Sequence, residues 1–349
     1  VMQKEKMLSA SDLSLFCYQL SLIFKSGIPI LDGMEIFAKD MMDARLKEVA
    51  QDMQQQLAQG YSLHSVIEKY KFFPVYLTSM VKIAEQTGNL QDELERLSDY
   101  YEQTDRLNNK IKSAVTYPLI LLVLMAGVIL FLVLKVLPMF HEILLSLGGD
   151  IPVSTKIMID LANILKTYAL AIIGVLIVAI ALLLYYFKSQ KNIESGDKIL
   201  FKLPWINATY KKIISARLAN AMTMMLKAGS SFDEALDMSK KSVGNAYVES
   251  LLEAARLNII NGSDPVKELD NLGIFPVLFM KMLKIGHMTG ELESSLSKIS
   301  VIYDKEVEKS LSKITTMIEP ALVTILSLII GVMLFTVMLP LINIIAAIG

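Results

Sequence analysis

Long uncharged apolar segments alternate with polar, amphipathic segments along this chain of 349 residues. Residues 113–134, 167–187 and 320–349 contain no charged side chain. A helix needs about 20 apolar residues to cross the ~30 Å hydrocarbon core of a bilayer, and all three segments are long enough. The pattern therefore predicts three transmembrane helices, which agrees with a hydrophobic content of 53%.

The polar segment before the first span has the apolar spacing of short helices separated by Gly and Pro. After a first helix that ends at Gly27 and Pro29, the expected helices cover 31–40, 43–59, 63–70 and 75–86. Ser62 is expected to cap the helix over 63–70, and Pro74 to lie in the first turn of the helix over 75–86. A long last helix is expected to start near Leu90 and to run through Lys112 into the first span.

The chain repeats itself at a constant offset of 202 residues. The matches include residues that shape the backbone: Gly27 and Gly229, Gly60 and Gly262, Phe73-Pro74 and Phe275-Pro276, Thr87-Gly88 and Thr289-Gly290, Pro118 and Pro320, Leu137-Pro138 and Leu339-Pro340. Chance does not plausibly place so many Gly and Pro coincidences in one register. We therefore expect an all-α membrane protein with two homologous cytoplasmic six-helix bundles plus three transmembrane helices. The last helix of each bundle continues into the membrane.

The distribution of Lys and Arg around the spans predicts their orientation. Basic residues cluster before the first span, after the second and before the third, whereas the loop between the first two spans has few and the C-terminal tail has none. We expect a cytoplasmic N-terminus, an extracytoplasmic C-terminus and, because residues 1–12 lack an apolar signal-peptide core, insertion by the internal spans. The expected division is a first cytoplasmic domain (1–112), a first span (113–136), an extracytoplasmic loop (137–166), a second span (167–187), a second cytoplasmic domain (188–319) and a third span (320–345).

The two copies differ in net charge. Residues 1–112 contain 13 basic and 16 acidic side chains, and residues 188–319 contain 18 basic and 16 acidic side chains. One fold with net charges of opposite sign need not bind the same surface twice. We therefore expect the copies to contact different partners.

Motifs for catalysis, metal binding and nucleic-acid binding are missing from the sequence. It has no Gly-Lys pair for a phosphate-binding loop and no HExxH spacing. Its single cysteine, Cys17, cannot form an intrachain disulfide and is expected to be buried. The 34 basic and 35 acidic side chains are balanced, which argues against a general nucleic-acid surface. We expect no enzyme activity, no metal, no cofactor and no nucleic-acid partner.

The best candidates for partner binding are the two segments around the repeated Thr-Gly pair. Their residues are Glu85, Thr87 and Gly88 in the first copy and His287, Thr289, Gly290 and Glu291 in the second. Both glycines are expected to end helices in the left-handed conformation, which does not exclude a partner contact. The acidic residues could meet a basic surface or a cation, although acids beside helices usually face solvent.

Four further residues lie in or beside the spans. Pro118 and Pro320 are candidate hinges where the helices enter the membrane, and Ser327 and Gly331 form a small-xxx-small pair that could allow two helices to approach closely. No ionisable residue lies inside a span, which disfavours the alternative that the chain is a small membrane transporter or channel component.

Several motifs together resemble a known family. They are residues 19–27 with Pro29, Lys-Ile-Ala-Glu-Gln-Thr-Gly-Asn-Leu at 82–90, Lys-Ile-Gly-His-Met-Thr-Gly-Glu-Leu at 284–292, and the prolines at 118, 138, 320 and 340. From about residue 9 to residue 345, the chain resembles the type II secretion F proteins and type IV pilus platforms, which include the competence-pilus platform of Gram-positive bacteria. One departure is His287, because repeats of this family commonly carry Glu at that position, as at Glu85.

The resemblance implies a non-enzymatic platform in the bacterial cytoplasmic (inner) membrane. Such a platform couples a cytoplasmic hexameric ATPase to the insertion or extraction of pilins or pseudopilins. The implied partners are that ATPase, the pilins, other inner-membrane assembly proteins, membrane lipid and further copies of the chain in a homo-oligomer.

Overall fold

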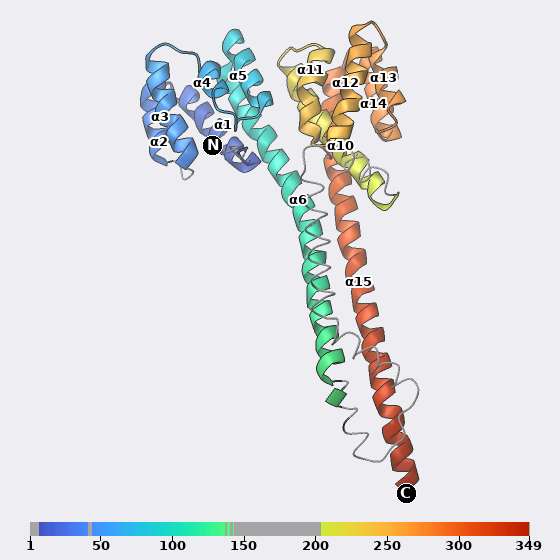
Figure 1. The fold of residues 1–349 in the computed structure, drawn as a ribbon. Coiled ribbons are helices and arrows are strands. Elements are labelled where there is room, and N and C mark those ends of the chain that lie inside the picture. Colours follow the sequence, from blue (N-terminus) through green and yellow to red (C-terminus); the bar gives the residue numbers. More distant parts are fainter. Residues whose placement is uncertain (1–6, 41–43, 137, 140–141, 143–203, 349) are drawn as a thin grey trace. The chain divides into compact units, whose positions relative to one another are not determined.

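The computed structural model describes residues 7–40, 44–136, 138–139, 142 and 204–348, and every regular element among them is a helix. The elements of the first copy are α1 (Ala10–Ser26), α2 (Ile30–Asp40), α3 (Ala44–Ala58), α4 (Leu63–Glu68), α5 (Val75–Thr87), α6 (Leu90–Phe131) and the π-helix η1 (Leu132–Val136) (Figure 1). Those of the second copy are α10 (Pro204–Lys227), α11 (Phe232–Ser239), the 3₁₀-helix η2 (Lys240–Val243), α12 (Ala246–Ile260), α13 (Pro265–Asn271), α14 (Val277–Thr289) and α15 (Leu292–Ile348).

The helix bounds reproduce the sequence repeat. Shifting α3 and α5 by 202 residues gives the bounds of α12 and α14, and the first residues of α4 and α6 fall on the first residues of α13 and α15. Similar residues therefore start and end similar helices in both copies. The copies differ after α11, where η2 takes the place of the last turn of α2. They also differ at α10, which starts earlier than the position that matches the start of α1, and at η1, whose matching residues lie within α15.

Local capping explains where several helices begin. Ser9 and Asp12 form a capping box at α1, and Ser231 and Glu234 form one at α11. Each such pair satisfies two N–H groups that have no partner inside the helix. Pro74 lies at the N-cap of α5 in extended conformation, one residue earlier than the expected first turn.

Aromatic and aliphatic side chains form the core of each copy. In the first, the Phe16 ring lies 5.0 Å from the ring of Phe73 and 5.5 Å from that of Phe37, measured between centroids. In the second, Phe275 and Phe279 stack at 4.4 Å. Cys17 is fully buried, as the sequence predicted. Burying each such large side chain stabilises the fold by about 1.5–3 kcal/mol.

The chain divides into two compact units. One comprises Val1–Lys110 and Ile193–Glu308, and the other comprises Ile111–Asn192 and Lys309–Gly349. The helices α6 and α15 each continue from the first unit into the second. Both are long and apolar enough to cross a membrane, with mean hydropathies of 2.5 for the most apolar stretch of α6 and 1.9 for that of α15. The predicted span over 167–187 and most of the loop before it lie outside the described residues.

Candidate functional site

The repeated Thr-Gly pair ends α5 and α14 in the same way. Gly88 and Gly290 have φ angles of 71° and 76°, in the left-handed region. A Cβ at either position would meet no atom within 4 Å, so glycine is required here for its backbone conformation and not for space. The expected left-handed helix ends are confirmed.

Hydrogen bonds around these glycines follow the Schellman pattern. Asn89 N donates to Ala84 O at 3.0 Å, and Glu291 N donates to Gly286 O at 2.8 Å. The hydroxyls of Thr87 and Thr289 donate to the carbonyl oxygens four residues earlier, at 3.0 and 2.9 Å. These four positions therefore have a structural role in both copies, which accounts for their recurrence without a ligand.

Glu85 has a role that the sequence did not reveal. Its carboxylate accepts hydrogen bonds from Leu63 N at 2.5 Å and from His64 N at 3.1 Å, and it lies 2.5 Å from His64 Nδ1. Ser62 occupies the N-cap of α4 but makes no side-chain capping bond. The prediction that the Ser62 hydroxyl caps this helix is therefore wrong. The capping oxygens belong to the Glu85 carboxylate on α5. The Glu85 side chain is only 18% exposed, unlike the solvent-facing acids that are usual beside helices.

The second copy reaches the same result with the residues exchanged. Asp264 stands at the position of Ser62, and its carboxylate accepts from Lys267 N at 2.9 Å. His287 stands at the position of Glu85. The backbone hydrogen bond from Lys267 and, more weakly, the nearby His287 imidazole lower the pKa of Asp264 below its ordinary value. The second copy thus lacks the acid of Glu85, where it has His287, but it has an acid at the N-cap of α13, Asp264. The capping carboxylate comes from α5 in the first copy and from the N-cap residue itself in the second.

The two copies contact each other through different surfaces. Tyr76 on α5 donates its buried hydroxyl to Ala221 O on α10 at 3.0 Å, and Asn220 on α10 donates to Gln103 Oε1 on α6 at 2.9 Å. The aromatic rings of Tyr76 and Tyr100 pack together beside this contact, with 4.9 Å between their centroids. The first helix of the second copy thus packs on the fifth and sixth helices of the first.

Arg217 joins three segments at this contact. Its Nη1 donates to Val243 O at 2.9 Å and its Nη2 donates to Asn108 Oδ1 on α6 at 2.8 Å. Burial lowers the pKa of the guanidinium below its ordinary value, but arginine stays charged at any physiological pH. Gly244 has φ 69°, and a Cβ there would lie only 2.7 Å from Arg217 Nη1. The backbone beyond η2 therefore fits the guanidinium closely.

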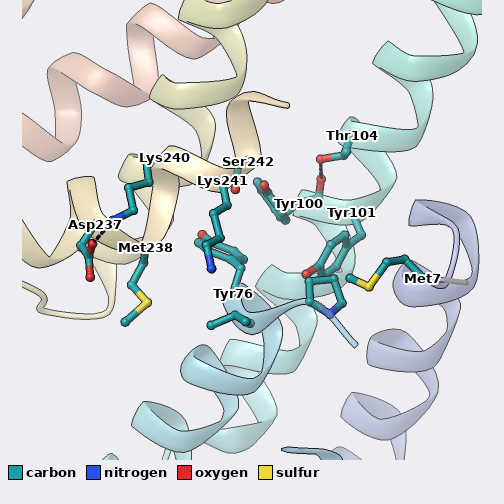
Figure 2. A pocket seen from close by; sticks show the side chains of 12 residues that line it. Met7, Tyr76, Tyr100, Tyr101, Thr104, Asp237, Met238, Lys240, Lys241 and Ser242 are labelled. Atoms are coloured by element: carbon teal, nitrogen blue, oxygen red, sulfur yellow. Dashed lines mark hydrogen bonds and ion pairs between the residues drawn. The ribbon is translucent and has the colours of Figure 1, made fainter. Parts of the chain in front are cut away.

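A cavity of about 430 Å³ opens beside this contact (Figure 2). Tyr76, Tyr100 and Thr104 line it from the first copy, and Asp237 and Lys241 from the second. Its aromatic wall and its charged wall thus come from different copies. On the charged wall the Lys240 ammonium lies 2.5 Å from both the Asp237 and the Glu253 carboxylates, so its charge is already paired.

The remaining predicted residues are placed but not brought together. Pro118 lies inside α6 and Pro320 inside α15, and both helices continue through them. Ser327 is exposed on α15, and a Cβ added at Gly331 would meet no atom within 4 Å. Glu291 is exposed at the start of α15. Hinge motion at the prolines and helix association through Ser327 and Gly331 stay predictions.

Tyr76 and Arg217 were missed as candidates because neither belongs to a matched motif. Their counterparts at the 202-residue offset are Leu278 and Leu15. A leucine in one copy is replaced by a tyrosine or an arginine in the other. Such a replacement indicates that the position has different neighbours in the two copies. Comparison of mismatches, and not only of matches, could have identified the contact.

The comparisons with known proteins agree with this duplicated architecture. The family described as "Type II secretion system (T2SS), protein F" matches residues 16–138 and again residues 218–340, two ranges separated by the same offset of 202. The chain is 30% identical to type IV pilus assembly protein PilC of Thermus thermophilus, over 97% of this chain and 84% of that protein. It is 26% identical to PilC of Pseudomonas aeruginosa (96% and 90% covered) and 25% identical to type II secretion system protein F of Vibrio cholerae (95% and 81% covered). This chain belongs to the type II secretion system protein F family, whose domain it contains twice.

Proposed function

We propose that the chain is the platform protein of a type IV pilus, a competence pseudopilus or a type II secretion system in a bacterial cytoplasmic membrane. Its relatives are named for pilus assembly and for type II secretion. The platform would couple a cytoplasmic hexameric ATPase to the insertion or extraction of pilins or pseudopilins.

The continuity of α6 and α15 is the observation that carries this proposal. Each helix begins beside a repeated Thr-Gly turn and extends without interruption into an apolar stretch. A continuous α-helix is held by its own backbone hydrogen bonds, of which Pro118 in α6 and Pro320 in α15 each remove one. Movement imposed on either polar copy can therefore reach the apolar stretch through a rod that does not need to refold.

The proposed topology places both copies in the cytoplasm, with the span over 167–187 returning the chain to that side. The N-terminus would be cytoplasmic and the C-terminus extracytoplasmic. This arrangement places both copies on the side of the ATPase, where one copy would dock mainly on the ATPase and the other would pack against its own symmetry mate. Catalysis has no part in this proposal, since motion is transmitted and no bond is changed.

Co-purification from native membranes tests the proposal. The full-length tagged chain should bring down a secretion-type ATPase and pilin-like proteins, identified by mass spectrometry, and an unrelated tagged membrane protein should not. Deletion of the gene should abolish surface pili, pseudopili or secretion, and the wild-type chain should restore them. Normal assembly and secretion in the deletion strain would overturn the proposed function.

A further inference from the structure

The contact between the two copies is head-to-tail: it joins one face of the first copy to a different face of the second. Two surfaces take part. The rod face contains Tyr76, Tyr100 and Gln103 on α5 and α6, and the first-helix face contains Arg217, Asn220 and Ala221 on α10. Because the copies share one fold, each copy has both faces.

Among the described residues, this contact covers one face of each copy. The rod face of the first copy meets the first-helix face of the second. Two faces are not part of that contact. The first-helix face of the first copy has Leu15 and Tyr18 exposed at the corresponding positions. The rod face of the second has exposed Leu278 and Lys305. A surface that is buried in one copy is thus open in the other.

Exposure shows the difference directly. Tyr76 is 6% exposed in the covered rod face, whereas its counterpart Leu278 is 49% exposed. Ile285 on α14 and Val301 on α15 are also exposed. An apolar surface of this kind is typical of a binding site.

The open first-helix face is apolar as well. Leu15, Tyr18 and Leu22 follow the i, i+3, i+7 spacing of one helix side on α1, and they are 52%, 48% and 43% exposed. Ile36 on α2, the counterpart of Met238 beside the cavity, is also exposed. The two open faces are therefore both apolar and not yet paired with each other.

Charge favours pairing of unlike copies over pairing of like copies. The open rod face has exposed Lys298 and Lys305. Beside the open first-helix face, Glu35 is paired with Lys39 at 2.8 Å and adds no net charge. In total, residues 1–112 have three more acidic than basic side chains, and residues 188–319 have two more basic than acidic ones. Opposite charges steer the first copy of one chain toward the second copy of another.

We infer that the occupant of both open faces is a second copy of this chain, bound by repetition of the internal contact. The rod face of the second copy, around Leu278 and Lys305, docks on the first-helix face of the next chain, around Leu15 and Tyr18. A head-to-tail contact gives a ring if its rotation closes and a filament if it does not. Because the proposed function anchors all copies in one bilayer, we expect the ring rather than the filament.

Cysteine cross-linking of the full chain in membranes tests this contact. The internal pair Asn220 and Gln103 corresponds to Tyr18 of one chain and Lys305 of its neighbour. Two differently tagged chains, one Tyr18→Cys and one Lys305→Cys, should cross-link with a short bismaleimide only when they are expressed together. A chain with both substitutions should give a ladder of oligomers. The wild-type chain is the blank, because its single Cys17 is buried.

The control is the internal pair in a single chain. Gln103→Cys with Asn220→Cys should cross-link within the monomer, which shows that the folded contact is present. If this control reacts and the mixed pair does not, or if either single variant cross-links with itself, the head-to-tail inference is wrong. Leu278→Glu should lower the oligomer size measured in detergent, whereas Leu257→Glu, at an exposed leucine on α12, should not.

The outcome is separable from that of the proposed function. Cross-linking without co-purified ATPase or pilins would support the inference and count against the platform role. Co-purification of those partners without the cross-link, in the presence of the reacting control, would support the platform role and overturn the inference.

Discussion

The Glu85 carboxylate caps the helix that begins at Leu63, accepting its backbone N–H at 2.5 Å across 22 residues of sequence. It also accepts from His64 N, so it binds two of the N–H groups that lack partners inside α4. In the second copy the capping carboxylate belongs to Asp264 at the N-cap itself. The same helix start is thus stabilised by an acid from two different positions, which makes the two solutions interchangeable in principle.

We predict that Glu85→Ala destabilises the protein and that Ser62→Asp restores it. The loss of a helix cap costs about 0.5–2 kcal/mol, and Asp at position 62 would copy the arrangement at Asp264. The measurement is the unfolding midpoint of the full chain in detergent for the single and double variants. Glu48→Ala, at an exposed position on α3, is the control and should change it little. Equal midpoints for Glu85→Ala with and without Ser62→Asp would contradict the exchange.

Acid should weaken the second copy through Glu253. Hydrogen bonds from Arg256 and Lys240 lower the pKa of Glu253 from 4.5 to about 2. A carboxylate with a lowered pKa adds stability above its unfolded pKa, and that stability is lost as the pH falls from about 4.5 toward about 2. Glu253→Gln should therefore lower the unfolding midpoint at pH 7 and flatten its fall over this range. Glu291→Gln, at an exposed position, should show the same dependence of the unfolding midpoint on pH as the wild type. If the midpoint of Glu253→Gln falls as steeply as that of the wild type, Glu253 is not the source of the acid sensitivity.

Arg217→Lys should loosen the contact between the copies. A lysine has one nitrogen and cannot reproduce the two guanidinium bonds to Val243 and Asn108 in their geometry. We expect a loss of about 1–2 kcal/mol and a lower yield of the internal cross-link between cysteines at 103 and 220. Lys227→Arg, a charge-preserving change on the same helix, is the matched control. An unchanged cross-link yield in Arg217→Lys would show that Arg217 does not hold the copies together.

The helices were predictable because their limits depend on local chemistry. Gly27, Gly88 and Gly290 end helices through backbone conformations that a neighbouring turn requires, and apolar spacing gives the faces in between. The helix expected over 43–59 is one residue longer than α3 at each end, and the helix expected over 75–86 is one residue shorter than α5 at its C-terminal end. The helix expected over 63–70 ends earlier, at Glu68.

The site was less predictable because it depends on distant contacts. The residues around Glu85 in the sequence do not indicate that its carboxylate accepts a hydrogen bond from α4. Likewise, Tyr76 donates a hydrogen bond to Ala221, which is 145 residues away in the sequence. Even so, the paired differences Ser62/Asp264 and Glu85/His287 were present in the aligned repeats. Two substitutions that move one acid between two positions indicate that those positions are in contact.

The proposed orientation predicts opposite labelling of two loops. Ser146→Cys, in the predicted extracytoplasmic loop, should react with a membrane-impermeant maleimide in intact cells, and Ser195→Cys should react only after lysis. Both positions lie outside the described residues, so this expectation rests on the distribution of basic residues around the spans. The wild-type chain, in which Cys17 is buried, gives the background. The reverse pattern would invert the topology.

The last prediction concerns transmission of motion along α6. An interior proline removes one bond of the helix's hydrogen-bond ladder and clashes with the preceding turn, at a cost of about 3 kcal/mol or more. Pro118 already introduces one such break near the membrane entrance of α6, and a second proline in the polar part would weaken the rod further. Arg106 lies on α6 between its start at Leu90 and Pro118, and its guanidinium pairs with Glu102 on the helix surface. Arg106→Pro should therefore interrupt the rod, whereas Arg106→Ala removes only an exposed ion pair worth roughly 0.3–0.5 kcal/mol. We expect Arg106→Pro to insert into the membrane at normal abundance and to reduce the yield of surface pili or pseudopili several-fold, with Arg106→Ala close to wild type. Normal assembly by a stably inserted Arg106→Pro chain would show that α6 is not the path of coupling.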